Sequence, residues 1–273
     1  MSGHVHLRSF EQHGDRLVLT CPYAVTVVQE APGIDNRNAF PWSRLFLMDP
    51  AGSNGADAVT DLAARRRHPL RPGEVLFLPP DRLYGFRFSP GMRMIACHFR
   101  LEWALGCDVF SGRTACEALT GCGDLITRAY AAAAAAESAH GGLGAVAELR
   151  GILLQLAGRF IRDVPTIAPR LQAVLAHIAG NSRADLAVDE LAAIAGLSRE
   201  HFSREFRREV GMPPKELLHR RLVQRACSSL LAGERVKDAA EQLGFTSEFY
   251  FSRFFKARTG IAPRDFARTA QGG

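Results

Sequence analysis

Two arginines occupy equivalent places in an internal repeat of this 273-residue chain. Phe202–Arg204 reads Phe-Ser-Arg, and the same three residues return as Phe251–Arg253. An arginine fork matches the O6 and N7 acceptors of guanine, a pairing worth about 1–3 kcal/mol of discrimination between bases. Two copies of such a residue suit a protein that contacts two neighbouring stretches of one DNA groove.

The repeat extends well beyond these arginines. Gly196 matches Gly244 at an offset of 48 residues, whereas Gly211 matches Gly260 at an offset of 49. One residue has therefore been inserted in the second turn. Each copy predicts a short helix, a turn and a longer helix, at about 188–210 and 236–259, because a glycine that can take positive φ follows each helix. Ser198 is a suitable N-cap for the longer helix of the first copy.

A long helix is expected to join the two copies. It opens at Pro213–Pro214, where proline is tolerated, and runs to about Ala232. At 1.5 Å per residue it spans roughly 27 Å. That length is near the roughly 34 Å that separates successive major-groove faces, so a stiff helix could hold two reading helices on one side of a duplex.

The first 100 or so residues have a different texture from the repeats. Short apolar runs separated by turn residues predict strands, which suggests a small sandwich or barrel. These runs are Leu17–Leu19, Ala24–Val28, Leu45–Met48, Val75–Leu78 and Met94–Phe99. The basic run Ala64–His68 is expected to form a solvated loop.

Two helices are predicted after the strands, at Arg113–Glu137 and Ala145–Arg162. The second has an apolar face from Leu149 to Phe160 at helical spacing. That face could pair two subunits or pack on the strands of its own chain, and the sequence favours neither. Asp163–Pro169 is predicted to be a linker because it contains two prolines.

Composition is that of an ordinary globular protein, with 47% hydrophobic and 23% charged residues. From residue 164 onward, 17 Lys and Arg stand against 12 Asp and Glu, a net charge of +5 that suits a polyanionic partner. The six cysteines form no Cys-x-x-Cys pair, so we expect thiols and no zinc site. Met1–His6 contains no secretory signal pattern and no apolar run reaches a membrane span, so a cytoplasmic protein is expected.

The stretch Gly244–Lys256 followed by Gly260–Pro263 resembles the signature of the AraC/XylS family of bacterial transcription regulators, and Glu190–Pro214 resembles its partner repeat. The resemblance covers roughly residues 168–268. It implies that the second helix of each repeat enters the major groove. Phe202, Phe206, Phe251 and Phe255, with Ala195, Leu197, Leu243 and Phe245, are then expected to be core residues rather than stacking platforms.

The resemblance places the DNA-facing residues on the outer faces of the two longer helices. Arg204 and Arg253 are the best candidates for guanine contacts, with phosphate contact as the alternative. Glu200 and Glu248 could accept from cytosine, and Phe249 could contact a thymine methyl. The full set of predicted DNA-binding residues is Arg199, Glu200, Ser203, Arg204, Arg207, Glu248, Phe249, Ser252, Arg253 and Lys256.

The segment Leu70–Tyr84 resembles the second conserved motif of a cupin barrel, the sensor fold found in many relatives of this family. Metal-binding cupins place a histidine where Tyr84 stands here, so no metal and no other cofactor is expected. The barrel is interpreted as a receptor for an unknown small effector. Its predicted effector-binding residues are Arg82, Tyr84, Arg87 and His98.

The sequence thus predicts an α+β protein, with a cupin-like β-barrel and following helices before an all-α domain of two helix-turn-helix units. Its expected domains are residues 1–110 for effector binding, 111–163 as a helical extension, 164–169 as a linker and 170–270 for DNA binding. The predicted function is a ligand-responsive transcription activator that binds promoter DNA and RNA polymerase and can form a homodimer. A cupin enzyme and a redox sensor based on Cys116 and Cys122 are the alternatives.

Overall fold

The computed structural model describes residues 18–28, 34–52, 57–104, 107–137, 142–161 and 167–271. The chain forms two compact units, each built from separate stretches of sequence. The first unit combines Met1–Thr20, Arg100–Gly112 and Arg162–Ser252, and the second combines Cys21–Phe99, Arg113–Ile161 and Arg253–Gly273. Most of the predicted linker, residues 163–166, lies outside the described residues, and the predicted domain bounds remain a prediction.

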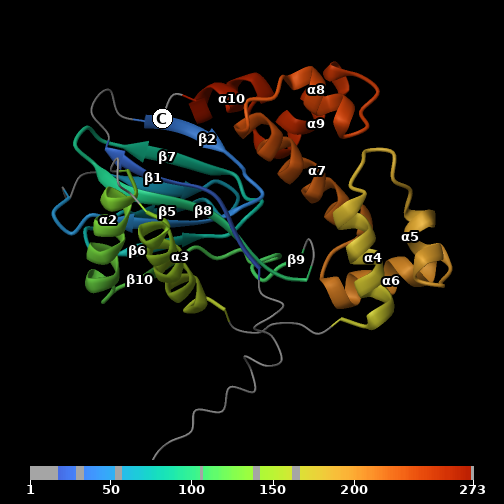
Figure 1. The fold of residues 1–273 in the computed structure, drawn as a ribbon, viewed down its shortest axis with the longest axis horizontal. Coiled ribbons are helices and arrows are strands. Elements are labelled where there is room, and N and C mark those ends of the chain that lie inside the picture. Colours follow the sequence, from blue (N-terminus) through green and yellow to red (C-terminus); the bar gives the residue numbers. More distant parts are fainter. Residues whose placement is uncertain are drawn as a thin grey trace, which may run out of the picture. The chain divides into compact units, whose positions relative to one another are not determined.

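Ten strands form two antiparallel sheets in the described part of the chain (Figure 1). The larger sheet has the order β1-β8-β3-β6-β10, with β9 paired to β8, and the smaller has the order β2-β7-β4-β5. The strands of the larger sheet are β1 (Val18–Val28), β3 (Ser43–Met48), β6 (Val75–Leu78), β8 (Arg93–Ala104), β9 (Cys107–Asp108) and β10 (Glu117–Leu119). Those of the smaller sheet are β2 (Ile34–Asn38), β4 (Ala58–Asp61), β5 (Arg66–Pro69) and β7 (Tyr84–Phe88).

The two sheets pack face to face through one apolar core. Phe46 on β3 contacts Phe86 and Phe88 on β7, with ring centroids 6.1 and 6.3 Å apart. Tyr84, Phe86 and Phe88 are buried because alternate residues of β7 face the core. The α+β class is therefore confirmed, but the predicted barrel is realised as two separate sheets rather than one closed sheet.

Two sequence predictions in this unit were wrong. Arg113–Glu137 is not helical throughout, because Glu117–Leu119 form β10 and pair with β6 before helix α2 (Gly123–Glu137) begins. The basic run that was expected to form a loop is largely strand β5, whose side chains are mostly exposed because it lies at a sheet edge. Charged side chains on an edge strand can stay in solvent, so such a strand needs no apolar pattern. The hydrophobic pattern of the sequence therefore did not reveal β5.

Helix α3 (Leu143–Gly158) packs against α2 and against its own sheet (Figure 1). Phe160, just beyond α3, stacks on Phe77 of β6 with 4.8 Å between ring centroids. Ile152, Leu153 and Leu156 are buried with it. The apolar face that the sequence left open between subunit pairing and self-packing is therefore covered within the chain.

Helices joined by short turns make up the described residues 167–271, and they follow the predicted order. They are α4 (Pro169–Gly180), α5 (Val188–Ile194), α6 (Arg199–Val210), α7 (Pro214–Leu231), α8 (Val236–Gln242), α9 (Glu248–Thr259) and α10 (Pro263–Gln271). Figure 1 shows α7 as one continuous helix between α6 and α8. None of the helices in the described ranges has the length and apolar character that a membrane crossing requires.

Candidate nucleic-acid interface

The turns of the two repeats have the same hydrogen-bonding pattern. In the first, the Leu197 amide donates to the Ala192 carbonyl over 3.0 Å, and in the second the Phe245 amide donates to the Ala240 carbonyl over 3.0 Å. Gly196 and Gly244 take φ of 66° and 76°, a left-handed conformation that glycine adopts without a steric penalty. The sequence repeat is thus a structural repeat down to its backbone.

The longer helices α6 and α9 also begin and end alike. Ser198 accepts a hydrogen bond from the His201 amide at 3.4 Å, and Ser247 accepts one from the Tyr250 amide at 3.2 Å. These are N-caps that satisfy an amide with no partner inside the helix. Gly211 and Gly260 follow the last turns with positive φ, as predicted.

The inner faces of α6 and α9 are aromatic and buried, as predicted. Phe202 and Phe206 on α6, and Phe251 and Phe255 on α9, have no exposed surface. Phe202 lies 5.3 Å from Phe206 between ring centroids, and Phe251 lies 5.3 Å from Phe245. Ala195 and Leu243 are also buried, whereas Leu197 and Phe245 are only half-buried.

The outer face of α6 is charged. Arg199, Glu200, Arg204 and Arg207 are exposed, and Ser203 is half-buried between them. Arg199 donates to the Asp189 carboxylate of α5 over 3.1 Å. The other predicted residues of this face form one strip along α6 that begins at Glu200 and ends at Arg207, with only Ser203 half-buried.

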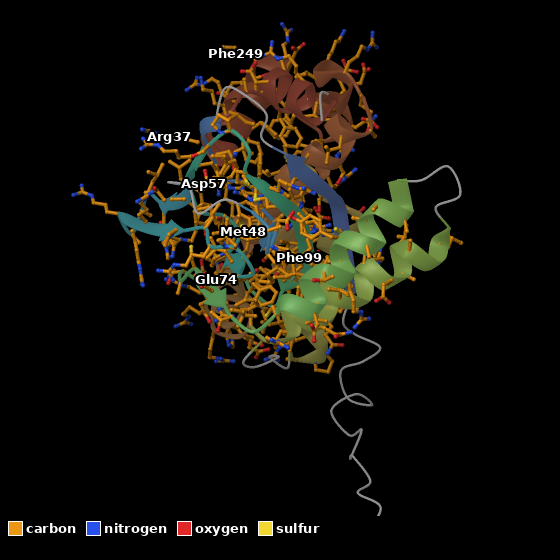
Figure 2. The ribbon with its side chains drawn as sticks, turned by 90° about the vertical axis from the view of Figure 1, so that its left-hand side faces the viewer. Arg37, Met48, Asp57, Glu74, Phe99 and Phe249 are labelled. Atoms are coloured by element: carbon orange, nitrogen blue, oxygen red, sulfur yellow. The ribbon has the colours of Figure 1, made fainter. Side chains whose placement is uncertain are left out.

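The outer face of α9 carries exposed aromatic residues at its start. Phe249 is 67% exposed and Tyr250 is 64% exposed, large values for apolar rings. Phe249 projects from the outside of the helical region in Figure 2. Arg253 and Lys256 are exposed further along α9, while Glu248 and Ser252 are half-buried. All ten predicted DNA-facing residues thus lie on the two longer helices, none of them fully buried.

Sequence reasoning missed a buried carboxylate that supports α6. Glu205 is 2% exposed, accepts from Arg170 Nε of α4 over 2.7 Å and lies 3.7 Å from His201 Nε2. A glutamate between two core phenylalanines is the signal that could have revealed it. Because a buried charge is costly without partners, this network fixes α6 against α4.

The segment Ser182–Asp185 connects the two repeats within the first unit. The Ala184 amide donates to the Leu243 carbonyl over 2.8 Å, just before the turn of the second repeat. Arg225 on α7 donates to the Ser182 carbonyl over 2.7 Å. The approach to the first repeat, the joining helix and the second turn are therefore hydrogen-bonded together.

The predicted effector residues Tyr84 and His98 both lie near Arg44, a residue that the sequence did not single out. Arg44 is 1% exposed, pairs with His98 across β3 and β8, and has its guanidinium carbon 5.5 Å from the Tyr84 ring centroid. Burial, and then the Arg44 charge, hold the pKa of His98 well below its usual value. An arginine inside an otherwise apolar strand was the signal for this site.

The other two predicted effector residues have different surroundings. Arg82 binds the buried Asp61 carboxylate through Nε and Nη2 at 3.0 and 2.6 Å. Arg87 is exposed because it alternates with the core-facing residues of β7. Only Tyr84 and His98 are thus brought together with Arg44 in the core.

Metal and thiol chemistry have little support near these residues. In the part of the chain that the structure describes, no group of three or more His, Cys, Asp or Glu side chains could hold a metal ion. The six cysteines are thiols rather than disulfides. Burial raises the pKa of Cys116 to about 11, which disfavours the reactive thiolate that a redox sensor needs.

The end of the second repeat packs against strands of its own unit. The Ala39 amide donates to the Thr259 carbonyl over 2.7 Å. Phe266 on α10 lies 5.4 Å from Phe40 and 6.3 Å from Trp42 between ring centroids. Trp42 in turn lies 6.2 Å from His98, so a continuous set of rings runs from α10 to the Arg44 region.

Comparisons with known sequences agree with this helical arrangement. A family model for a helix-turn-helix domain matches residues 191–269. The HTH-type transcriptional activator AarP of Providencia stuartii is 36% identical over 91 residues, which cover 33% of this chain and 67% of that protein. The activator Btr of Bacillus subtilis is 24% identical over 199 residues, 68% of this chain and 38% of the relative. This chain thus spans two thirds of AarP and well under half of Btr.

Among solved structures, Vibrio cholerae ToxT is similar over almost the whole chain. One ToxT structure has a TM-score of 0.60 at 13% identity, covering 95% of this chain and 100% of ToxT. Another, which holds (E)-4-(8-methylnaphthalen-1-yl)but-3-enoic acid, has a TM-score of 0.61 at 12% identity, with coverages of 93% and 99%. A third holds an unsaturated fatty acid, with a TM-score of 0.56 at 14% identity and coverages of 94% and 96%. At these identities the similarity establishes the fold alone.

Proposed function

Because this chain belongs to the AraC/XylS family of DNA-binding transcription regulators, we propose that α6 and α9 are its two recognition helices. The observation that carries the proposal is the repeated geometry. Each helix is fixed by a glycine turn, a serine N-cap and buried aromatic rings, and presents its other face to solvent. A rigid helix with one exposed face is the element that enters the major groove in helix-turn-helix proteins.

The outer residues have distinct proposed roles. Arg204 and Arg253 contact guanine, while Arg207 and Lys256 contact phosphate. Glu200 and Glu248 accept from cytosine, and Phe249 contacts a thymine methyl. Ser203 and Ser252 hydrogen-bond to either a base or phosphate. Arg199 contributes positive charge while its ion pair with Asp189 holds the first turn of α6.

The helix α7 sets the distance between the two reading helices. Its 18 residues span about 27 Å. This is close to one turn of DNA, so the two helices can occupy successive major-groove faces.

Selection of bound duplexes from a random DNA pool tests this proposal. We expect an enriched sequence with two conserved blocks about one helical turn apart. Selection with the Arg204→Ala chain should degrade one block, and selection with Arg253→Ala should degrade the other. Arg128→Ala, which removes an exposed arginine of α2, is the control. Recovery of no preferred sequence, with or without metabolites from a cell extract, would contradict the proposal.

We further propose that the paired sheets receive a small effector near Arg44, Tyr84 and His98. Arg82, bound to Asp61, and the exposed Arg87 of β7 are proposed to contribute positive charge near this site. The two small molecules held by ToxT are carboxylic acids, and a buried arginine surrounded by aromatic rings is a fitting partner for a carboxylate. The proposal includes no metal, cofactor or catalytic residue, and the protein is proposed to act as a regulator rather than as an enzyme.

The contact between α10 and the strands offers a path from effector to DNA. An effector near His98 shifts Trp42 and thereby Phe266, which biases the position of the second repeat. Trp42→Ala should then make DNA affinity independent of a metabolite extract that changes it in the unsubstituted protein. Tyr130→Phe, which removes a hydroxyl near Leu47, is the control and should respond normally.

Two of the relatives are transcriptional activators, which supports activation as the mode of control. We propose that this protein activates transcription through contact with RNA polymerase, acts in the cytoplasm and forms a homodimer. Leu143 of α3 is 88% exposed and, with Val146 and Leu154, gives an apolar surface on which two copies could meet.

A further inference from the structure

The end of β8 and the middle of α7 enclose a polar hollow of about 200 Å³. Its lining residues are Arg100, Arg221, Gln224, Arg225, Ser228 and Ser229, all within the first unit. None of them belongs to the predicted effector or DNA-contacting sets. The hollow is smaller than the roughly 300–1,000 Å³ of pockets that enclose a whole drug-sized ligand, so it suits a small ion or the head group of a larger molecule.

Positive charge exceeds negative charge around this hollow. Three arginines line it, and Glu102 supplies the nearest carboxylate, with Oε1 lying 3.3 Å from Arg100 Nη1 and 3.1 Å from Arg221 Nη1. Asp108 also faces Arg100, but burial raises its pKa to about 7 and so weakens its negative charge near neutral pH. The two guanidinium groups are therefore incompletely neutralised.

Arg100 and Arg221 share the same hydrogen-bond acceptor. Both donate through Nη1 to Gln224 Oε1, the Arg221 bond being 3.2 Å long. Burial lowers the pKa of Arg221, Glu102 raises it and the Arg100 charge lowers it again. The Nε atoms of Arg100 and Arg221 are buried and find no hydrogen-bond partner among the described residues. Buried donors without acceptors are costly, so the two guanidinium groups are held in this arrangement at a free-energy cost.

We propose that this hollow binds an oxyanion, either a carboxylate or a phosphate group, held chiefly by Arg100 and Arg221. Arginine forks match the geometry of both groups and can bind two oxygens at once. Arg225 adds charge while it remains bonded to the Ser182 carbonyl, and Ser228 supplies a hydroxyl at the exposed rim. The negative charge of the oxyanion reduces the repulsion between the two guanidinium groups.

Occupancy of the hollow bears on regulation because Arg100 lies on β8 and Arg221 lies on α7. A shared oxyanion ties the strand to the helix that joins the two repeats, and it thereby changes affinity for DNA. This consequence rests on the proposed function, whereas oxyanion binding itself does not.

Titration of the full chain with inorganic phosphate and, separately, with hexanoate tests the binding site. Calorimetry and the shift of the unfolding temperature are measured at constant ionic strength, with sodium chloride as the reference. At least one of the two anions should bind with a Kd below about 1 mM, and the stronger arm identifies the class of ligand. Binding of neither anion beyond the chloride reference would overturn the proposal.

Variants of the arginines and of Glu102 should move the affinity in opposite directions. Arg221→Gln and Arg100→Gln should each weaken binding at least tenfold, whereas Glu102→Gln should strengthen it because it removes the competing carboxylate. Arg220→Gln removes the same charge one position away on α7, outside the hollow, and should leave affinity within about twofold. Equal anion affinities of the Arg221→Gln and Arg220→Gln chains would overturn the assignment of the oxyanion to Arg221. Weaker anion binding by the Glu102→Gln chain would also overturn it, so the test does not depend on the folding of any single variant.

Affinity for the selected DNA duplex, measured with and without the anion, then tests whether oxyanion binding changes DNA binding. A change in DNA affinity that disappears in Arg221→Gln supports the regulatory link. Anion binding without any DNA binding would contradict the proposed function but leave the oxyanion site standing. DNA binding that is indifferent to a bound anion would overturn the regulatory link alone.

Discussion

In the first repeat, α6 presents Glu200 and His201 at the positions where α9 of the second repeat presents Phe249 and Tyr250. The turns before these positions share their hydrogen bonds and their left-handed glycines. Three positions after His201 in α6 and after Tyr250 in α9, both helices carry an exposed arginine, Arg204 and Arg253 respectively. The repeats therefore share their backbone framework and one exposed arginine, while the exposed side chains in the first turns of α6 and α9 differ in chemistry.

The buried framework and the exposed surface of the repeats are thus under separate physical constraints. Buried rings and capping residues must satisfy the fold, so they recur in both copies. Exposed residues need only avoid destabilising the helix, so they are available to match different base pairs. Four experiments test whether the two repeats share a framework and differ in their surfaces.

The largest effect is expected from the shared arginines. Arg204→Ala and Arg253→Ala should each weaken binding to the selected duplex by about 1–3 kcal/mol, and should weaken binding to random DNA much less. Fluorescence anisotropy titrations at one fixed salt concentration measure both affinities. Arg208→Ala, an exposed arginine of α6 outside the predicted set, is the control. Equal losses on both kinds of DNA would mean that the arginine contacts phosphate only.

Replacement of the two turn glycines, Gly196 and Gly244, should lower the free energy of unfolding by different amounts. Alanine at Gly196 or Gly244 should each cost about 1–2 kcal/mol, because both have positive φ. The loss at Gly244 should be larger, since an added Cβ would lie 3.3 Å from both Arg183 Nε and Asp185 Oδ1, whereas at Gly196 it meets nothing within 4 Å. Urea unfolding measures the difference. Gly180→Ala in α4 is the control, and a larger cost at Gly196 would refute the ranking.

The two serine caps should contribute similar amounts to stability. Ser198→Ala and Ser247→Ala should each lower the free energy of unfolding by about 1 kcal/mol, because each removes an acceptor for the first turn of its helix. Ser198→Asp and Ser247→Asp should restore most of the loss. If alanine proved neutral at one site only, the two helix starts would not be equivalent.

The smallest effects should have opposite signs in the two repeats. Phe249→Ala should weaken binding to the selected duplex by about 0.8 kcal/mol, the value of one buried methylene-sized contact. Glu200→Ala at the equivalent position should strengthen binding to random DNA, because it removes a negative charge near phosphates. Anisotropy titrations on both duplexes compare them. Losses of equal size and sign would show that the two helix starts act alike.

Much of the helical half could be predicted because its signals are local. Gly196, Gly211 and Gly260 end helices through their own conformational freedom, and Ser198 caps through a residue three positions away. The first boundaries of α6 and α7 were therefore predicted to within a residue.

What could not be predicted depends on residues distant in sequence. Arg44 is a core residue only because β3 lies between β6 and β8, and β10 is a strand only because β6 offers it an edge. Likewise, Arg221 meets Glu102 across 119 positions of sequence. No local sequence pattern marks Arg221 or Glu102, so the polar hollow could not be predicted without the fold.

The hydrogen bond from Ala184 to Leu243 has a consequence for promoters. Because this bond fastens the second turn to the approach of the first repeat, we expect that neither proposed recognition helix can rotate freely about α7. Insertion of about 5 base pairs between the two blocks of a natural site would turn one block to the opposite side of the double helix. Such a promoter would retain every recognised base and yet engage only one helix at a time, so transcription control by this protein should depend on helical phasing as strictly as on base identity.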